Sequence, residues 1–257
     1  ENVRKKIDSI DEKIIDLLSD RMELAVLAGK VRQSNEVDET REKQVIENIT
    51  KRSEPKLDTQ FTKDLYSRLL SESKRLQGEG LQVIGFQGEH GAYSEIAAKK
   101  FSPQAIAMPC TEFVDVFKGV EAKHFDYGVV PVENSLEGPV TQVNDLLIET
   151  PLKVVGEVKL QISHCLLSLP ETDFRDIKLV YSHPQALGQC HEFIERHGFK
   201  AMPFYDTAGA AKMLSSEKRS DAAVIASPLC AELYGLEVLK ENFHVHALKT
   251  TRFLMLS

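Results

Sequence analysis

Cysteine is scarce and scattered in this sequence. The 257 residues include four cysteines, and no two of them form a CxxC pair. This spacing excludes the usual zinc-binding and disulfide frameworks. His191 and His197 are six residues apart, which places them on different faces of a helix rather than at one metal site. We therefore expect free, buried thiols, with no metal and no cofactor.

Long apolar runs and an excess of positive charge are also missing. No run approaches the length of a membrane span, and the first residues are polar rather than signal-like. The chain has 32 Lys+Arg against 39 Asp+Glu, which gives a formal net charge of −7. Nucleic-acid binding requires a basic surface that this balance does not provide. We expect a cytoplasmic protein without a nucleic-acid or membrane partner.

The first part of the chain has the periodicity of long helices. Between Val3 and Arg32 there is no proline, and apolar residues recur at alternating spacings of four and three. This pattern predicts a helix of about 45 Å with a heptad seam that packs against other helices. Two shorter amphipathic stretches follow, the second with Asp58 as a candidate N-cap. We expect an all-α domain over residues 1–79, with helices at 3–32, 40–52 and 58–77.

After the Gly78-Glu79-Gly80 segment the pattern changes to short β-rich runs that alternate with helical stretches. Such alternation is typical of α/β domains with largely parallel sheets. We expect a second domain over residues 80–257. The predicted strands are 81–86, 127–132, 153–158, 163–168, 179–182 and 222–226, and the predicted helices are 93–100, 113–122, 184–197 and 208–214.

One charged residue interrupts the heptad seam. Arg21 stands between Leu17 and Leu24, where an apolar residue is due. An arginine in that place can simply extend its charged end into solvent. Arg32, however, lies eleven residues later on the same face, about 16 Å along the axis. Because the residues between them are small, two inward-reaching arginines at this spacing could hold a small dianion.

The other predicted helices carry matching polar clusters. Asp38, Arg41 and Glu42 have i, i+3, i+4 spacing, and Ser73 and Gln77 lie one turn apart. Buried polar groups of this kind need a ligand to satisfy them.

Through the strings VRKKIDSIDEKIIDLLSDRMELA, DETREKQVI and ESKRLQ, residues 3–77 resemble the all-helical family of chorismate mutases. That family rearranges chorismate to prephenate without a nucleophile, by holding a compact conformer and stabilising charge on the breaking ether oxygen. The resemblance implies eight substrate-contacting positions: Arg4, Arg21, Arg32, Asp38, Arg41, Glu42, Ser73 and Gln77.

The roles implied for these positions follow their charges. Arg32 and Gln77 would contact the ether oxygen, Arg21 and Arg4 would bind carboxylates, and Asp38 and Glu42 would orient the ring hydroxyl. The sequence departs from the family in having arginine rather than lysine at position 32, and in a segment before Asp38 that is about three residues short. Arginine keeps the charge but changes its reach and geometry.

Arg4 indicates a second chain. It lies about 26 Å along the helix from Arg21, too far for both to hold one small molecule. In a dimer with antiparallel long helices, Arg4 could serve the partner's site, as the resemblance also implies. The unpaired heptad seam independently calls for a partner, and we expect an obligate homodimer through the helical domain.

In the second domain, four segments place small polar residues where strands turn into helices. Free N–H groups at such helix N-termini suit carboxylates, and four of them together predict a cleft for a polyanionic small molecule. The segments are GFQGEHGAYS at 85–94, PVENS at 131–135, SHPQ at 182–185 and DTAG at 206–209.

These strings, with YSHPQALGQC, YGLEVL and TTRF, make residues 81–257 resemble the prephenate dehydratases. The resemblance implies two α/β lobes around a cleft, like type II periplasmic binding proteins. It also implies conversion of prephenate to phenylpyruvate by loss of water and carbon dioxide. Aromatisation drives this reaction, so the enzyme need only orient the carboxylates and help the ring hydroxyl to leave.

By the same resemblance, Thr251 contacts the leaving hydroxyl, and Asn134 and Gln189 complete the catalytic set. Arg252 is either a substrate clamp or an inter-lobe salt bridge, and His183 is either a general base or a turn-stabilising residue. The substrate-binding residues implied for the cleft are Ser135, Ser182, His183, Thr207, Ala208, Arg252 and Phe253.

Other interpretations remain open. The helical domain could be a decayed mutase that serves only for dimerisation. The chain could instead be a ligand-sensing regulator or a non-catalytic solute-binding protein, although the near-neutral first 80 residues disfavour DNA binding. Relatives in the family often continue into a C-terminal phenylalanine-binding regulatory domain, and the sequence ends five residues after Arg252, without one.

Overall fold

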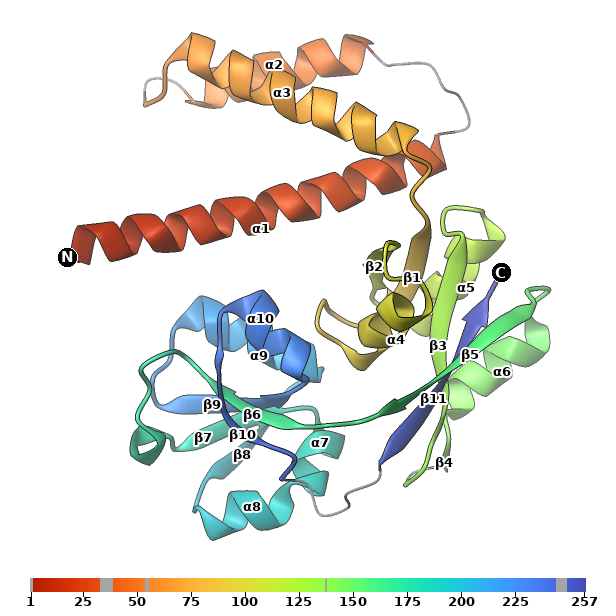
Figure 1. The fold of residues 1–257 in the computed structure, drawn as a ribbon, viewed down its shortest axis with the longest axis vertical. Coiled ribbons are helices and arrows are strands. Elements are labelled where there is room, and N and C mark those ends of the chain that lie inside the picture. The colour runs from red at the N-terminus through yellow and green to blue at the C-terminus, as the bar shows by residue number, and fades with distance from the viewer. Residues whose placement is uncertain (1, 33–38, 54–55, 137, 244–248) are drawn as a thin grey trace. The chain divides into compact units, whose positions relative to one another are not determined.

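The computed structural model describes residues 2–32, 39–53, 56–136, 138–243 and 249–257. The chain divides into two compact units, Glu1–Gln82 and Val83–Ser257 (Figure 1). The division lies just beyond the glycine-containing segment 78–80. None of the described helices is both long and apolar enough to cross a membrane.

The described part of the first unit is helical, as predicted. Its elements are α1 (Asn2–Val31), α2 (Glu39–Ser53) and α3 (Thr59–Gly78). Asp58 caps α3 by accepting a hydrogen bond from the backbone N–H of Phe61 at 2.8 Å. α3 packs against both α1 and α2. The heptad seam of α1 stays uncovered in the single chain, where Val3 is 70% exposed and Leu17 is 67% exposed.

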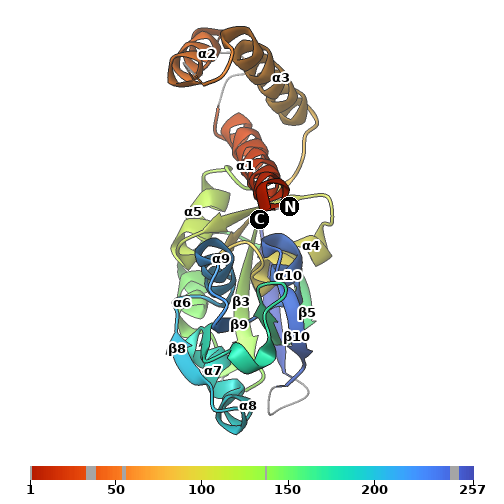
Figure 2. The ribbon, with the colours of Figure 1, turned by 90° about the vertical axis from the view of Figure 1, so that its left-hand side faces the viewer.

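The second unit contains two sheets. The first has the order β2 (Ile106–Cys110), β1 (Val83–Gln87), β3 (Tyr127–Asn134), β11 (Thr250–Leu256) and β5 (Val154–Gln161), and β4 (Gly138–Pro139) pairs with β3. Figures 1 and 2 show α4 (Tyr93–Phe101) on one face of this sheet and α5 (Phe113–Glu121) and α6 (Thr141–Glu149) on the other.

The second sheet has the order β10 (Glu237–Glu241), β6 (Cys165–Ser168), β9 (Ala222–Ala226), β7 (Leu179–Ser182) and β8 (Lys200–Pro203). The short helices α7 (Pro184–Gln189) and α8 (His191–Arg196) pack with the buried cluster on one face. The helices α9 (Thr207–Glu217) and α10 (Pro228–Tyr234) pack with the cluster on the other. A 3-10 turn, η1 (Phe174–Asp176), precedes β7.

Side-chain alternation explains why these strands are covered on both faces. Successive residues of a strand point to opposite sides, so Val129 packs in the core beneath α4 while Val130 packs beneath α5 and α6. The chain passes between the sheets twice, from β5 to β6 and from β10 to β11. The largest buried cluster contains residues of both sheets, so the two lobes share one core.

The structure corrects two sequence-based expectations and adds elements that the sequence did not predict. The sheets are mixed rather than largely parallel, because β11 returns from the second lobe and pairs antiparallel with both β3 and β5. The helix predicted at 184–197 is two helices, interrupted at Cys190 (φ −108°), shortly after the weak helix former Gly188. The elements that the sequence did not predict are β2, β4, β8, β10, β11, α6, α10 and the 3-10 turn η1.

Candidate active sites

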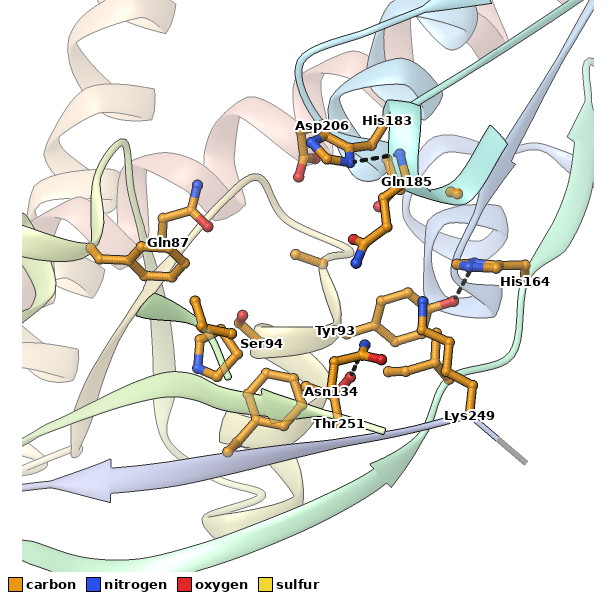
Figure 3. A pocket seen from close by; sticks show the side chains of 18 of the residues that line it. Gln87, Tyr93, Ser94, Asn134, His164, His183, Gln185, Asp206, Lys249 and Thr251 are labelled. Atoms are coloured by element: carbon orange, nitrogen blue, oxygen red, sulfur yellow. Dashed lines mark hydrogen bonds between the residues drawn. The ribbon is translucent and has the colours of Figure 1, made fainter. Parts of the chain in front are cut away.

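A cleft of about 530 Å³ lies between the two sheets of the second unit (Figure 3). Its lining combines residues from the ends of β1, β3 and β11 with residues from the N-termini of α4, α7 and α9. Five residues proposed from the sequence are among those that line it: Asn134, His183, Thr207, Thr251 and Phe253.

Thr251 and Asn134 lie next to each other in the wall of this cleft. They are direct partners in the antiparallel pairing of β11 with β3. The Asn134 side-chain amide donates to Thr251 Oγ1 at 3.0 Å, and its carbonyl oxygen accepts from the backbone N–H of Leu136 at 3.0 Å. The second bond fixes the orientation of the amide, so Thr251 receives a hydrogen bond and its own O–H can be donated to a ligand.

Helix N-termini supply further donors. Tyr93 and Ser94 begin α4, His183 caps α7, and Asp206 caps α9, and all of them line the cleft. His183 Nδ1 accepts from the backbone N–H of Gln185 at 3.3 Å, which fits the turn-stabilising role considered for it. The first backbone N–H groups of such helices and their dipoles favour anionic ligands.

A polar cluster joins the lobes beside the cleft. Glu89, in the loop before α4, accepts from Lys212 of α9 at 2.8 Å and from Tyr205 at 3.1 Å. The Lys212 and Tyr205 contacts lower the pKa of Glu89 against the effect of its burial. Burial raises the pKa of Asp206, and the nearby Glu89 charge adds to the rise.

Gln189 is connected to the cleft through His164. The imidazole of the buried His164 contacts the Tyr93 hydroxyl at 3.2 Å and Gln189 Oε1 at 2.8 Å, while Tyr93 also donates to the Ser163 carbonyl at 2.6 Å. Both nitrogens of His164 are thus engaged within the protein. Gln189 supports the cleft wall from behind rather than lining it.

Four other residues proposed from the sequence lie outside the cleft lining. Ser182 is buried and donates to the Ile225 carbonyl at 2.6 Å, Ala208 is fully buried, and Ser135 accepts from the backbone N–H of Thr250. Arg252 points to the opposite side of β11 from Thr251, and its guanidinium lies 2.8 Å from the Glu157 carboxylate on the neighbouring strand.

In the helical unit, three of the proposed residues come together between α1 and α3. Arg21 donates to Ser73 Oγ at 2.6 Å, and Gln77 donates to the Ala25 carbonyl at 2.7 Å. A Cβ on Gly29 would lie 2.9 Å from Gln77, so the glycine lets this side chain approach α1. The small residues between Arg21 and Arg32 therefore make room for polar groups of α3.

The other proposed mutase residues are arranged differently. Glu42 pairs with Lys74 of α3 at 2.7 Å, which the sequence analysis did not anticipate. Arg4, Arg32 and Arg41 are exposed in the single chain. Asp38 lies outside the described residues.

Within either unit, the described His, Cys, Asp and Glu side chains form no group of three close enough to share a metal ion. Burial raises the pKa of the thiols, to about 12 for Cys190 and about 11 for Cys110, Cys165 and Cys230. These cysteines are therefore poor nucleophiles and poor metal ligands.

Lys249 lines the cleft but was missed by the sequence analysis. A period-two reading of the segment before Thr251 would have found it, because residues two apart in an extended chain share a face.

Family models match both parts of the chain. The prephenate dehydratase model covers residues 84–257 and the chorismate mutase type II model covers residues 3–78. The chain therefore belongs to the prephenate dehydratase family. It also matches the bifunctional chorismate mutase/prephenate dehydratase of Escherichia coli with 35% identity over 277 residues, across 99% of this chain and 71% of that protein. Its two-domain organisation is that of this bifunctional group.

Plant relatives and solved structures match the second unit. The chain is 42% identical over 196 residues to arogenate dehydratase/prephenate dehydratase 2 of Arabidopsis thaliana, and spans 51% of its length. The prephenate dehydratase of Arthrobacter aurescens, solved with L-Phe, has 30% identity and a TM-score of 0.63, with 68% of this chain and 60% of that chain covered. A quorum-quenching acylase, GqqA, has 36% identity and a TM-score of 0.64, with 68% and 64% covered. The chain thus spans only about half the length of the plant relative.

Proposed function

We propose that this chain catalyses two consecutive reactions of phenylalanine synthesis. The helical unit rearranges chorismate to prephenate, and the cleft of the second unit converts prephenate to phenylpyruvate by dehydration and decarboxylation. The observation that carries the proposal is the Thr251–Asn134 pair, whose hydroxyl can donate into a cleft lined by helix N-termini. The matches of the chain to both family models support both reactions of the proposal.

In the cleft, the difficult step is departure of the ring hydroxyl as water. A hydrogen bond from Thr251 to that hydroxyl stabilises the charge that develops as the C–O bond breaks. Asn134 holds Thr251 in place by donating to its oxygen, and the Thr251 O–H is then donated to the substrate. Loss of the ring carboxylate as carbon dioxide completes the aromatic ring, because the electron pair of the broken C–C bond becomes a ring double bond. The electron pair of the broken C–O bond leaves with the hydroxyl, which takes up a proton from solvent and departs as water.

In the helical unit, catalysis requires positioning and charge stabilisation rather than a nucleophile. Arg21, which donates to Ser73, binds a carboxylate of chorismate. The Gln77 amide donates one N–H to the Ala25 carbonyl and offers its second N–H to the ether oxygen. Glu42, tethered by Lys74, orients the ring hydroxyl. Arg32 supplies positive charge at the end of α1, in place of the usual lysine.

We also propose a homodimer through α1. Seven apolar seam residues of α1 are exposed in the single chain: Val3, Ile7, Ile10, Ile14, Leu17, Leu24 and Val31. An antiparallel copy of α1 would cover this seam and bring Arg4 to the other chain's site. We place the protein in the cytoplasm, where the four free thiols remain reduced.

The dehydratase half is tested with Thr251→Val, which removes the hydroxyl and keeps the shape. Phenylpyruvate formation from prephenate should fall by about 10²–10⁴-fold, the usual effect of losing a positioned proton or hydrogen-bond donor. Thr250→Val is the matched control, since Thr250 precedes it on the same strand and is exposed. Equal activity of the two variants would refute the assignment.

The mutase half is tested with Arg21→Ala. Loss of chorismate should slow by about 10²-fold or more, because the transition state loses a charged hydrogen-bond donor. Arg68→Ala, an exposed arginine on α3, serves as the control. If Arg21→Ala and the wild type consume chorismate equally slowly, the helical unit is a dimerisation domain only.

A further inference from the structure

Lys249 lies directly before β11, in line with Thr251. Its backbone carbonyl accepts a hydrogen bond from the N–H of Ile162 at 2.7 Å, which extends the pairing of β11 with β5 by one step beyond Thr250 and Gln161. Residue 249 is therefore extended, and its side chain leaves the strand on the same face as Thr251, two residues later. Figure 3 shows both side chains in the cleft.

This lysine is buried to an unusual degree. Only 3% of its surface is exposed, and lysines are almost never buried so far unless their charge is paired. Its stem packs in the cleft wall, while the residue still borders the cavity. It is the one lysine or arginine among the described residues that line the cleft.

Arg252 does not supply this charge. It projects from the opposite face of β11, is partly exposed to solvent, and is paired with Glu157 at 2.8 Å. That ion pair also raises the pKa of Arg252 and lowers the pKa of Glu157. Among the described residues that line the cleft, Lys249 is therefore the lysine or arginine available to a ligand's negative charge.

We propose that Lys249 is the cationic receptor for a substrate carboxylate, specifically the carboxylate on the pyruvyl side chain. The inference rests on the proposed dehydratase function and adds a residue to that site. Prephenate has two carboxylates, one on the ring and one on the side chain. The ring carboxylate leaves as carbon dioxide, and a cation that held its charge in the ground state would slow that departure. The side-chain carboxylate persists in phenylpyruvate, so a cation there assists binding without opposing the reaction.

A contact made equally in substrate and transition state lowers KM and leaves kcat unchanged. The test is Lys249→Met, which keeps the length of the side chain and removes its charge. We expect the KM for prephenate to rise by about tenfold or more, with kcat changed by less than about threefold. Inhibition by added phenylpyruvate should weaken by the same factor as KM rises, because substrate and product share the carboxylate. Lys249→Arg should recover part of both effects.

Lys159→Met is the matched control, because Lys159 is an exposed lysine on β5, next to β11. It should leave KM and product inhibition unchanged. Thermal unfolding of each variant separates loss of binding from loss of folding, and Lys249→Gln replaces Lys249→Met if the latter does not fold.

Three outcomes would overturn the inference. A fall in kcat at constant KM would assign the amine to the leaving hydroxyl. A raised KM with unchanged phenylpyruvate inhibition would assign it to the ring carboxylate. Unchanged kinetics would leave it without a role in binding. A wild type that makes no phenylpyruvate would instead refute the proposed function, and calorimetric binding of phenylpyruvate to wild type and Lys249→Met would still decide whether Lys249 binds the carboxylate.

Discussion

The Asp206 carboxylate is largely buried at the N-terminus of α9. Its side chain accepts from the backbone N–H of Gly209 at 2.7 Å, which lowers its pKa, but burial outweighs this and raises the pKa above the ordinary value of 3.8. A raised pKa means that the folded state binds the proton more tightly than the unfolded chain does. Ionisation of Asp206 therefore costs stability as the pH rises from about 4 through the raised folded value.

The first prediction follows from this sign. Asp206→Asn keeps a good N-cap and removes the buried charge, so its melting temperature relative to wild type should increase as the pH rises through that window and then level off. Asp221→Asn is the control of opposite sign, because Arg219 lowers the pKa of Asp221. For this pair, the wild type should have the higher melting temperature above about pH 4, and this difference should disappear on acidification. Melting-temperature differences that do not change with pH would contradict both the raised pKa of Asp206 and the lowered pKa of Asp221.

At the scale of single residues, the sequence pointed to some of the side chains that line the cleft and missed others. Thr251 and Asn134 could be identified from short motifs, because those motifs specify residue types that meet in one cleft. Arg252 lies in the same motif, but strand alternation turns it to the opposite face, toward Glu157. Lys249 precedes the TTRF motif and is not part of it, and its burial depends on residues distant in sequence, so composition alone could not single it out.

The low reactivity of the cysteine thiols is a prediction that rests partly on the sequence and partly on the structure. Scattered spacing predicted free thiols, but their low reactivity comes from burial. With its pKa raised to about 12, Cys190 has a thiolate fraction of about 10⁻⁴ at pH 8. Mass spectrometry should find it unmodified by iodoacetamide in the native protein and modified in urea. Rapid native labelling of Cys190 would contradict its burial.

Among the structural elements, the loop before α4 depends on one glycine. Gly91 has φ +93°, and a Cβ at this position would lie 2.6 Å from Cys230 Sγ in α10. Its N–H donates to the buried Glu95 at 2.7 Å, and its carbonyl accepts from Ser227 at 2.6 Å. The glycine thus ties α4 to α10 and positions the helix N-terminus that faces the cleft.

We expect Gly91→Ala to destabilise the protein by about 2–4 kcal/mol, since it combines backbone strain with overpacking. Gly198 also has a positive φ (+69°), but a Cβ there would meet nothing within 4 Å. Gly198→Ala should cost only about 1 kcal/mol, the conformational part alone. Urea unfolding followed by circular dichroism compares the two, and equal costs would show that the Cys230 contact is unimportant.

The long helix α1 gives the clearest prediction for an element. Leu17→Glu places a charge within the exposed seam and should convert the proposed dimer to a monomer. Ile15→Glu is an equally drastic change at an exposed apolar residue of α1 that lies outside the seam, and it should leave the dimer intact. Sedimentation of both variants distinguishes a seam interface from general surface hydrophobicity.

At the scale of the whole molecule, local patterns predicted element types better than their arrangement. The periodicities of 3.6 and 2 are local, and they identified α1 to α3 and the buried strands β7 and β9 with accurate bounds. The antiparallel placement of β11 between β3 and β5 depends on a return from the other lobe, which no local pattern records. Exposed elements such as β10, where charged and apolar residues mix, give little periodic signal.

The proposed dimer places one active site across two chains and the other within one chain, and this difference can be tested by mixing variants. If Arg4 of one chain completes the mutase site of a second copy, Arg4→Ala and Arg21→Ala homodimers are both inactive on chorismate. A heterodimer of the two has one intact site and one that lacks both arginines. Random pairing of equal amounts makes half of the dimers mixed, so co-expression should restore about a quarter of wild-type mutase activity.

The dehydratase cleft provides the internal control for that experiment, because its described lining comes from a single chain. Mixing Thr251→Val with an equal amount of wild type should give about half of the wild-type dehydratase activity, whatever the pairing of subunits. Mutase activity that stays near zero in the Arg4→Ala and Arg21→Ala mixture would show that Arg4 serves no neighbouring site. The expected outcome is that this mixture regains chorismate turnover while its formation of phenylpyruvate from prephenate does not change. That result would show that dimerisation matters to the helical unit and not to the cleft.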